Sequence, residues 1–177
     1  MKKLLVIFTL VITICLAGCT STPAVSDDTP AASFEKSDIA LTYDGVTVRP
    51  SDNVQTLLDK LGDDYECSEM TSCNYGENGM DKGFTYFGGD VVISTVPLDR
   101  NGDYINGIDV YADGWSTAAS VGIGDSRDDI ISAYGQPDSE EGGFMIYYVD
   151  PSDAASMSLY FTVENDTVTS IGFSAGH

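Results

Sequence analysis

The chain has only one histidine, which is its last residue. It therefore has no internal histidine, and histidine is the commonest general base of enzymes. Without an internal histidine it has no Ser–His or Cys–His pair, and it contains neither a G-x-S-x-G motif nor a glycine-rich phosphate loop. Acidic residues are frequent, but among 28 of them close pairs arise by chance, so no acid–base dyad is assignable. We therefore expect that the protein is not an enzyme.

Basic residues are also scarce, with 8 lysine and arginine residues and a net charge of −20. Nucleic-acid binding requires a basic surface that neutralises phosphates, and this composition excludes one. The same charge opposes docking on anionic lipid. The acidic surface confers solubility, and the attraction of a cationic partner remains an alternative.

The longest hydrophobic run, residues 4–16, is too short for a membrane-spanning helix, which needs about 20 apolar residues. It follows two lysines, as the hydrophobic region of a signal peptide does. The run ends in LAGC at 16–19, which resembles the lipobox of bacterial lipoproteins. The resemblance implies that residues 1–18 are removed and that the Cys19 sulfur carries a lipid. An ordinary signal peptide that contains a cysteine is the alternative.

Residues 19–39 are rich in Ser, Thr, Ala, Pro and Asp and contain little that a core can bury. Such a composition is typical of a disordered segment. We predict a lipidated tether here, with the lipid holding the protein on the extracytoplasmic side of a bacterial membrane. The sequence does not distinguish an envelope with one membrane from an envelope with two.

Two cysteines remain beyond the predicted signal peptide and the lipidated residue, namely Cys67 and Cys73. Their spacing suits a small disulfide-closed loop in an exported protein. Free thiols and a metal site are the alternatives, but a zinc site needs about four ligands. We predict the disulfide, and neither a metal nor a cofactor.

The segment DRNGD at 99–103 places Asp99, Asn101 and Asp103 at the first, third and fifth positions of a calcium-binding loop. The pattern then fails, because the sixth position is Tyr104 instead of glycine and the twelfth is Val110 instead of glutamate. A hairpin turn explains the same residues with fewer assumptions, and it is our prediction.

Two segments of the chain share a helical pattern, NVQTLLDKLGDD at 53–64 and SRDDIISAYGQPD at 126–138. In each, apolar residues recur at helical spacing and a glycine follows the last of them. The candidate N-caps are Ser51 or Asp52 for the first helix, and Asp125 or Ser126 for the second.

After each predicted helix the hydrophobic period changes to two, which predicts three strands and tight hairpin turns. The expected strands are residues 83–87, 91–98 and 104–112 after the first helix, and 144–150, 157–164 and 167–175 after the second. We therefore predict an α+β fold of two tandem helix-plus-antiparallel-meander repeats, residues 40–113 and 114–177, with the helices on one face of a sheet.

The segment VGIGDSRDDIISAYGQPD at 121–138 resembles the α+β unit of two known families. The unit is found singly in outer-membrane assembly lipoproteins of the SmpA/OmlA type and in tandem in the β-lactamase inhibitory protein. The first copy departs from the pattern, with Asp64 where the proline is expected. The resemblance implies a sheet like that of the inhibitory protein, and it suggests inhibition of β-lactamase or of peptidoglycan-processing enzymes.

Alternation along the predicted strands places tyrosines on the sheet face away from the helices. We expect Tyr111, Tyr147 and Tyr160 to form a protein-binding face there, with Trp115 as an anchor at the joint between the repeats. The alternative is that these aromatic residues pack across strands.

The leading hypothesis from the sequence is a lipid-anchored, noncatalytic envelope protein that binds or scaffolds another envelope or secreted protein. The first alternative is the enzyme inhibitor that the resemblance suggests. The second is an envelope hydrolase that uses paired carboxylates. The partner and the oligomeric state are left open.

Overall fold

The computed structural model describes residues 34–176, and the predicted signal peptide and Cys19 lie outside them. Within the described residues, 47% are in strands and 15% in helices. The predicted α+β fold of two helix-plus-meander repeats is therefore wrong. The chain instead forms one eight-stranded antiparallel sheet and a second sheet of three strands, with two short α-helices.

The large sheet has the strand order β3-β4-β5-β6-β11-β10-β9-β8. Its centre is the pairing of β6 with β11, where Ile108 lies opposite Phe173 and Val110 opposite Ile171. Residues 40–113 and 114–177 therefore contribute to one sheet. The strands are β3 (Tyr65–Thr71), β4 (Met80–Tyr86), β5 (Val91–Asp99), β6 (Gly102–Val110), β8 (Ser139–Glu141), β9 (Phe144–Tyr148), β10 (Ser158–Glu164) and β11 (Thr167–Ser174).

The small sheet, which was not expected, has the order β2-β1-β7. It comprises β1 (Leu41–Tyr43), β2 (Val46–Val48) and β7 (Trp115–Thr117). Asp44 and Gly45 join the first two strands and both have positive φ, at 42° and 82°. Positive φ at both central residues is the geometry of the tightest hairpin turns, and it explains how three-residue strands can pair.

The α-helices are α1 (Gln55–Leu61) and α2 (Arg127–Tyr134), and the 3-10 helices are η1 (Lys36–Asp38) and η2 (Phe87–Gly89). Ser126 caps α2 as expected, and its hydroxyl accepts a hydrogen bond from the Asp129 backbone N–H at 3.2 Å. The caps expected for α1 are wrong. The Asn53 side chain instead accepts a hydrogen bond from the Gln55 backbone N–H at 2.9 Å.

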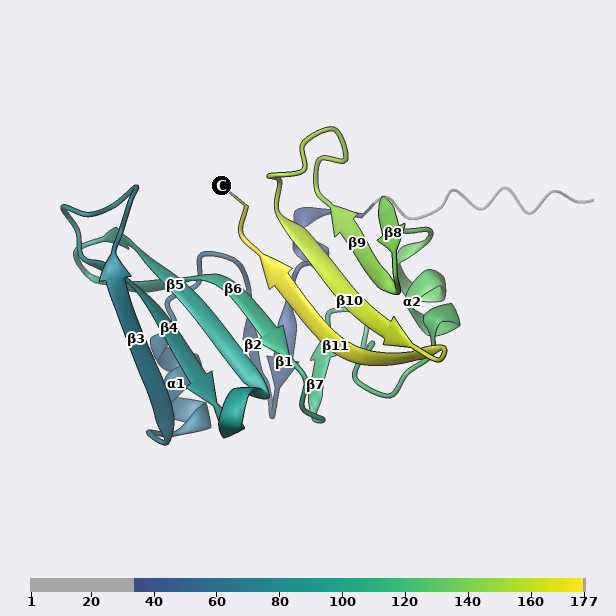
Figure 1. Ribbon diagram of the computed structural model, residues 1–177, viewed down its shortest axis with the longest axis horizontal. Helices are drawn as coiled ribbons and strands as arrows, with labels where there is room; N and C mark the ends of the chain where they lie inside the picture. Colours follow the sequence, from purple (N-terminus) through teal and green to yellow (C-terminus); the bar gives the residue numbers. More distant parts are fainter. Residues whose placement is uncertain (1–33, 177) are drawn as a thin grey trace, which may run out of the picture.

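Both α-helices and the small sheet pack on the same face of the large sheet, and Figure 1 looks onto its other face. A tyrosine hydroxyl of the large sheet donates a hydrogen bond to the carbonyl at the end of each α-helix. Tyr86 donates to the Gly62 carbonyl and Tyr147 to the Gly135 carbonyl, each at 2.9 Å. Both glycines have positive φ and end their helices, as the sequence predicts.

The edge strands β3 and β8 explain part of the error in fold class. Every residue of both strands is exposed, so neither shows the alternating hydrophobicity that identifies a strand in the sequence.

The predicted tether also ends earlier than expected. Phe34 packs against Tyr134 and Tyr147, with ring centroids 5.9 and 5.6 Å apart, and Ile39 is fully buried.

Candidate functional site

The face of the large sheet opposite the α-helices is covered by no other element of residues 34–176; we call it the open face. Leu159 and Phe161 of β10 point to the core, so Tyr160 between them lies on the open face. Small residues dominate its middle strands, namely Gly83, Ser94, Gly107, Gly172 and Ser174. The face is therefore shallow at its centre.

Three aromatic residues form a patch on the open face, which we call the aromatic patch: Tyr111, Phe144 and Tyr160. The rings of Phe144 and Tyr160 are 5.5 Å apart. The Tyr160 hydroxyl donates to an Asp109 carboxylate oxygen at 2.8 Å. Burial, Asp109 and Tyr111 together raise the pKa of Tyr160 far above its usual value. The patch is thus a neutral, hydrogen-bonded aromatic surface on a strongly acidic protein.

Two of the four residues expected at the binding face lie in the core instead. Tyr147 is 1% exposed, because it pairs with the core residue Leu159 and leaves Ile146 opposite Tyr160. Trp115 is 2% exposed and stacks on Tyr43, with ring centroids 4.8 Å apart. Tyr147 was misplaced because a one-residue change of register moves a side chain to the other face of a sheet. Trp115 was misplaced because it lies in β7 of the small sheet, which was not expected.

Two adjoining hollows lie at one end of the large sheet, and together they form what we call the end groove. Their volumes are about 460 and 430 Å³. Asp81, Val96 and Asn106 line both hollows. Asn106 is the extra residue of a β-bulge, because Ser94 pairs with Gly107 while Thr95 pairs with Ile105. Bulges re-aim side chains and are common beside functional sites.

Asp81 is the one polar side chain of the described residues that has a buried atom without a hydrogen-bond partner. Its Oδ1 atom is inaccessible to solvent and accepts no hydrogen bond. None of the ion pairs found among residues 34–176 includes it. No pattern in the sequence marks this residue, since it is one of 28 acidic residues.

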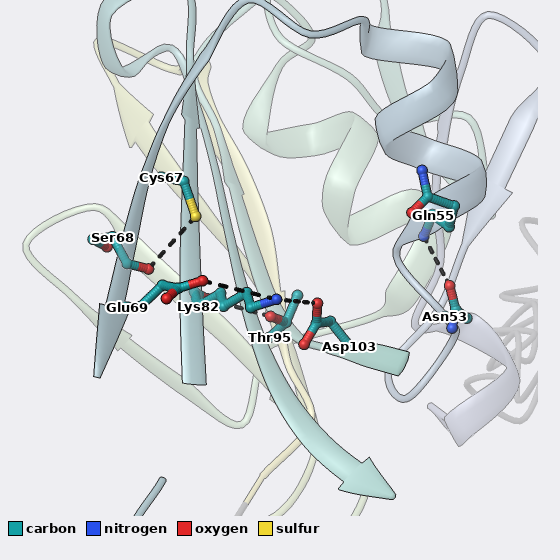
Figure 2. Close-up of polar contacts among 8 residues, drawn as sticks. All are labelled: Asn53, Gln55, Cys67, Ser68, Glu69, Lys82, Thr95 and Asp103. Atoms are coloured by element: carbon teal, nitrogen blue, oxygen red, sulfur yellow. Dashed lines mark hydrogen bonds and ion pairs between the residues drawn. The ribbon is translucent and has the colours of Figure 1, made fainter. Parts of the chain in front are cut away.

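Lys82, the next residue on β4, is by contrast ion-paired. Its ammonium group lies 2.8 Å from Asp103 and 3.9 Å from Glu69. Figure 2 shows the lysine between these two carboxylates. The Thr95 hydroxyl donates to the Lys82 carbonyl at 3.4 Å. The hydrogen bond with Asp103 raises the pKa of Lys82. This lysine therefore holds the hairpin of β5 and β6 against β3 and β4.

The segment 99–103 forms the predicted hairpin turn between β5 and β6. The Asp99 carboxylate accepts hydrogen bonds from the Asn101 backbone N–H at 2.7 Å and from the Tyr104 hydroxyl at 3.0 Å. These bonds lower the pKa of Asp99. Asp103 points instead to Lys82. No three His, Cys, Asp or Glu side chains of the described residues gather as a metal site requires.

Cys67 and Cys73 are both free and exposed. Cys67 lies within β3, opposite Phe84, and Cys73 follows the end of that strand. The expected disulfide between them stays a prediction from the cysteine spacing. The thiol of Cys67 lies 3.8 Å from the Ser68 carbonyl oxygen. Figure 2 shows this contact.

Comparison with family models, curated proteins and solved structures finds no match for this chain. The resemblance to the SmpA/OmlA and β-lactamase-inhibitory units therefore stays a prediction from sequence. Among residues 34–176, no helix has both the length and the hydrophobicity that crossing a membrane requires.

Proposed function

We propose that this chain is a lipid-anchored, noncatalytic protein of a bacterial envelope that binds another protein on its open face. The observation that carries the proposal is the aromatic patch. It lies on a sheet face that no other described element covers. Exposed apolar patches on soluble domains mark interaction sites, and tyrosine is enriched among the residues that dominate binding energy.

The geometry of the patch supports binding more than simple cross-strand packing. Tyr111 is 55% exposed and Phe144 39% exposed, so both rings present most of one face to solvent. Tyr160 is held in place by Asp109 and loses little entropy when a partner covers it. A pre-organised aromatic surface surrounded by small polar residues matches the composition of protein-binding faces.

Anchoring is the second part of the proposal, and it rests on LAGC at 16–19. Lipid on Cys19 would hold the open face outside the cytoplasm, where envelope and secreted proteins are accessible. Metabolic labelling with a palmitate analogue tests this directly. The native chain should incorporate the label and sediment with membranes, whereas Cys19→Ala should do neither.

Binding is tested by capture from envelope extracts on the immobilised full-length protein, compared with a Tyr111→Ala/Phe144→Ala variant. Both rings are exposed, so their removal should leave the fold intact, which circular dichroism would check. A matched control is Phe87→Ala, which removes a ring that is also 55% exposed but lies in η2, directly after β4. Purified β-lactamases and peptidoglycan-processing enzymes, the partners that the resemblance suggests, are tested individually.

We expect the double variant to lose about tenfold or more in affinity for the captured partner, because such aromatic anchors carry most of the binding energy. Phe87→Ala should bind as the native protein does. Equal binding by the double variant would place the interface elsewhere and contradict the proposal, and so would the capture of no partner.

A further inference from the structure

The aromatic patch has an acidic residue beside each of its rings. At one end, the Tyr111 backbone N–H donates to the Asp90 carbonyl at 2.8 Å, which continues the pairing of β5 with β6 and places the two residues opposite each other. In the middle, the Tyr160 hydroxyl donates to an Asp109 carboxylate oxygen, also at 2.8 Å. Two of the three rings therefore adjoin an acidic residue.

The third ring, Phe144, adjoins Glu141 through the hairpin that joins β8 to β9. The two residues are paired in the sheet, so their side chains project from the same face, with Cβ atoms about 5 Å apart. Met145 beside Phe144 is fully buried, which places Phe144 and Glu141 on the open face. Asp90 and Glu141 are both exposed, and neither belongs to an ion pair found among residues 34–176. Their charges are therefore available to a partner.

The basic residues of the chain lie away from the patch. All 8 lysine and arginine residues fall outside β6, β8, β9, β10 and β11, the strands that hold or flank it. Arg127 of α2 contacts Glu140 of β8 at 2.7 Å, but this glutamate pairs with the core residue Met145 and so points to the face that the helices cover. The patch therefore combines aromatic rings with uncompensated negative charge.

A guanidinium group matches both features of this surface at once. It is a planar cation that stacks on aromatic rings and forms two parallel hydrogen bonds with a carboxylate, whereas an ammonium group is a compact and strongly hydrated charge. The net charge of −20 also favours the approach of a basic segment over that of an acidic one. Arginine is therefore the side chain that this surface suits best.

We propose that the aromatic patch binds two arginine side chains of a basic segment of the partner, one at Tyr111 and Asp90 and one at Phe144 and Glu141. The proposal rests on the proposed function, because it names the chemistry of the protein that binds the open face. Tyr111 follows β6 and Phe144 begins β9, so the two positions are three strand spacings, about 14 Å, apart (Figure 1). Two arginines four residues apart in an extended segment are separated by about 13 Å and point to the same side.

The test uses the peptide acetyl-Arg-Gly-Ser-Gly-Arg-amide, added to the purified full-length protein in a nonionic detergent. Saturation-transfer NMR compares its affinity with that of a peptide in which citrulline replaces both arginines, because citrulline keeps the shape and lacks the charge. The variant Asp90→Asn/Glu141→Gln removes two charges from the patch. The matched control, Glu77→Gln/Asp128→Asn, removes two exposed charges from the loop after β3 and from α2.

We expect the arginine peptide to bind the native protein about tenfold more tightly than the citrulline peptide, because two stacked and paired guanidinium groups are lost together. The variant Asp90→Asn/Glu141→Gln should lose most of that preference, and the matched control should retain it. Equal binding of the two peptides by the native protein overturns the proposal, whether or not the variants fold. An equal loss in the matched control also overturns it, because general charge attraction then explains the binding.

The lysine peptide, acetyl-Lys-Gly-Ser-Gly-Lys-amide, is a separate arm. It carries the same charge without the planar group, so binding as tight as that of the arginine peptide would overturn the proposal.

Partner capture is measured independently with the native protein and with Tyr111→Ala/Phe144→Ala. If capture depends on the rings while the arginine and citrulline peptides bind equally, the proposed function stands and only this inference is wrong. If no partner is captured while the arginine peptide shows its preference, the proposed function is wrong and the arginine site remains.

Discussion

Tyr160 on β10 donates its hydroxyl proton to Asp109 on β6, at 2.8 Å, across the intervening strand β11. The ring lies over Gly172, where an added Cβ atom would come within 2.5 Å of it. Glycine is therefore needed at this position for the ring to cross the strand. The contact joins residues 51 positions apart and fixes the aromatic patch to the centre of the large sheet.

Tyr160→Phe should lower the free energy of unfolding by about 1.5 kcal/mol, the typical value of a hydrogen bond to a charged group. Urea denaturation monitored by circular dichroism measures the change. Tyr111→Phe is the matched control, because Tyr111 is exposed and should change stability by less than about 0.5 kcal/mol. Equal losses in the two variants would show that the Asp109 contact contributes nothing.

Stability should fall at alkaline pH because of the buried tyrosines. Burial raises the pKa of Tyr147 to about 12 and that of Tyr86 to about 12, from 10.0. Between pH ~10 and pH ~12 the unfolded chain releases phenolic protons that the folded chain retains. The folded state binds more protons there, so the free energy of unfolding decreases as pH rises from about 10 towards about 12 and is insensitive to these groups below that window.

Urea midpoints measured from pH ~8 to ~11.5 test this dependence. Tyr147→Phe should be less stable at neutral pH, because it loses the bond to the Gly135 carbonyl. It should also show a shallower decline above pH ~10, because one of the titrating groups is gone. A decline as steep as that of the native protein would mean that Tyr147 does not titrate in this range.

Trp115 should behave as a core residue and not as the binding anchor that the sequence suggested. It is the only tryptophan, so its fluorescence is unambiguous. Because it is 2% exposed, its emission should be blue-shifted and resistant to acrylamide quenching until the protein unfolds. Trp115→Ala should cost about 3 to 5 kcal/mol of stability. Efficient quenching in the folded state would show that Trp115 is exposed and would contradict this prediction.

Sequence reasoning located the elements with strong hydrophobic patterns. β5 and β10 alternate cleanly, and the two stop glycines, Gly62 and Gly135, end their helices as predicted. The exposed edges β3 and β8 carry no such pattern. Their omission, together with that of the small sheet, made a mostly β fold look like an α+β one.

The candidate site was predicted only in part, for reasons of register. Tyr111 and Tyr160 were placed correctly on the open face, because the pattern of β6 and β10 determines their direction. Tyr147 was misplaced by a single position of register. Asp81 was not identified, because it is one of 28 acidic residues and no local pattern in the sequence marks it.

The thiols of Cys67 and Cys73 provide a direct test of the described fold. Both are exposed, so a thiol-specific alkylating reagent should label both in the folded, unreduced protein, as peptide mass spectrometry would show. Cys67→Ser and Cys73→Ser should each lose one label and keep the other. A disulfide requires Cα atoms within about 7 Å, whereas the extended stretch from Cys67 to Thr71 alone spans about 13 Å.

Labelling that requires prior reduction would reveal the disulfide that the cysteine spacing suggested. The chain would then have to turn back directly after Thr71, and the last pairs of β3 with β4, which include Met70 with Asp81, would have to rearrange.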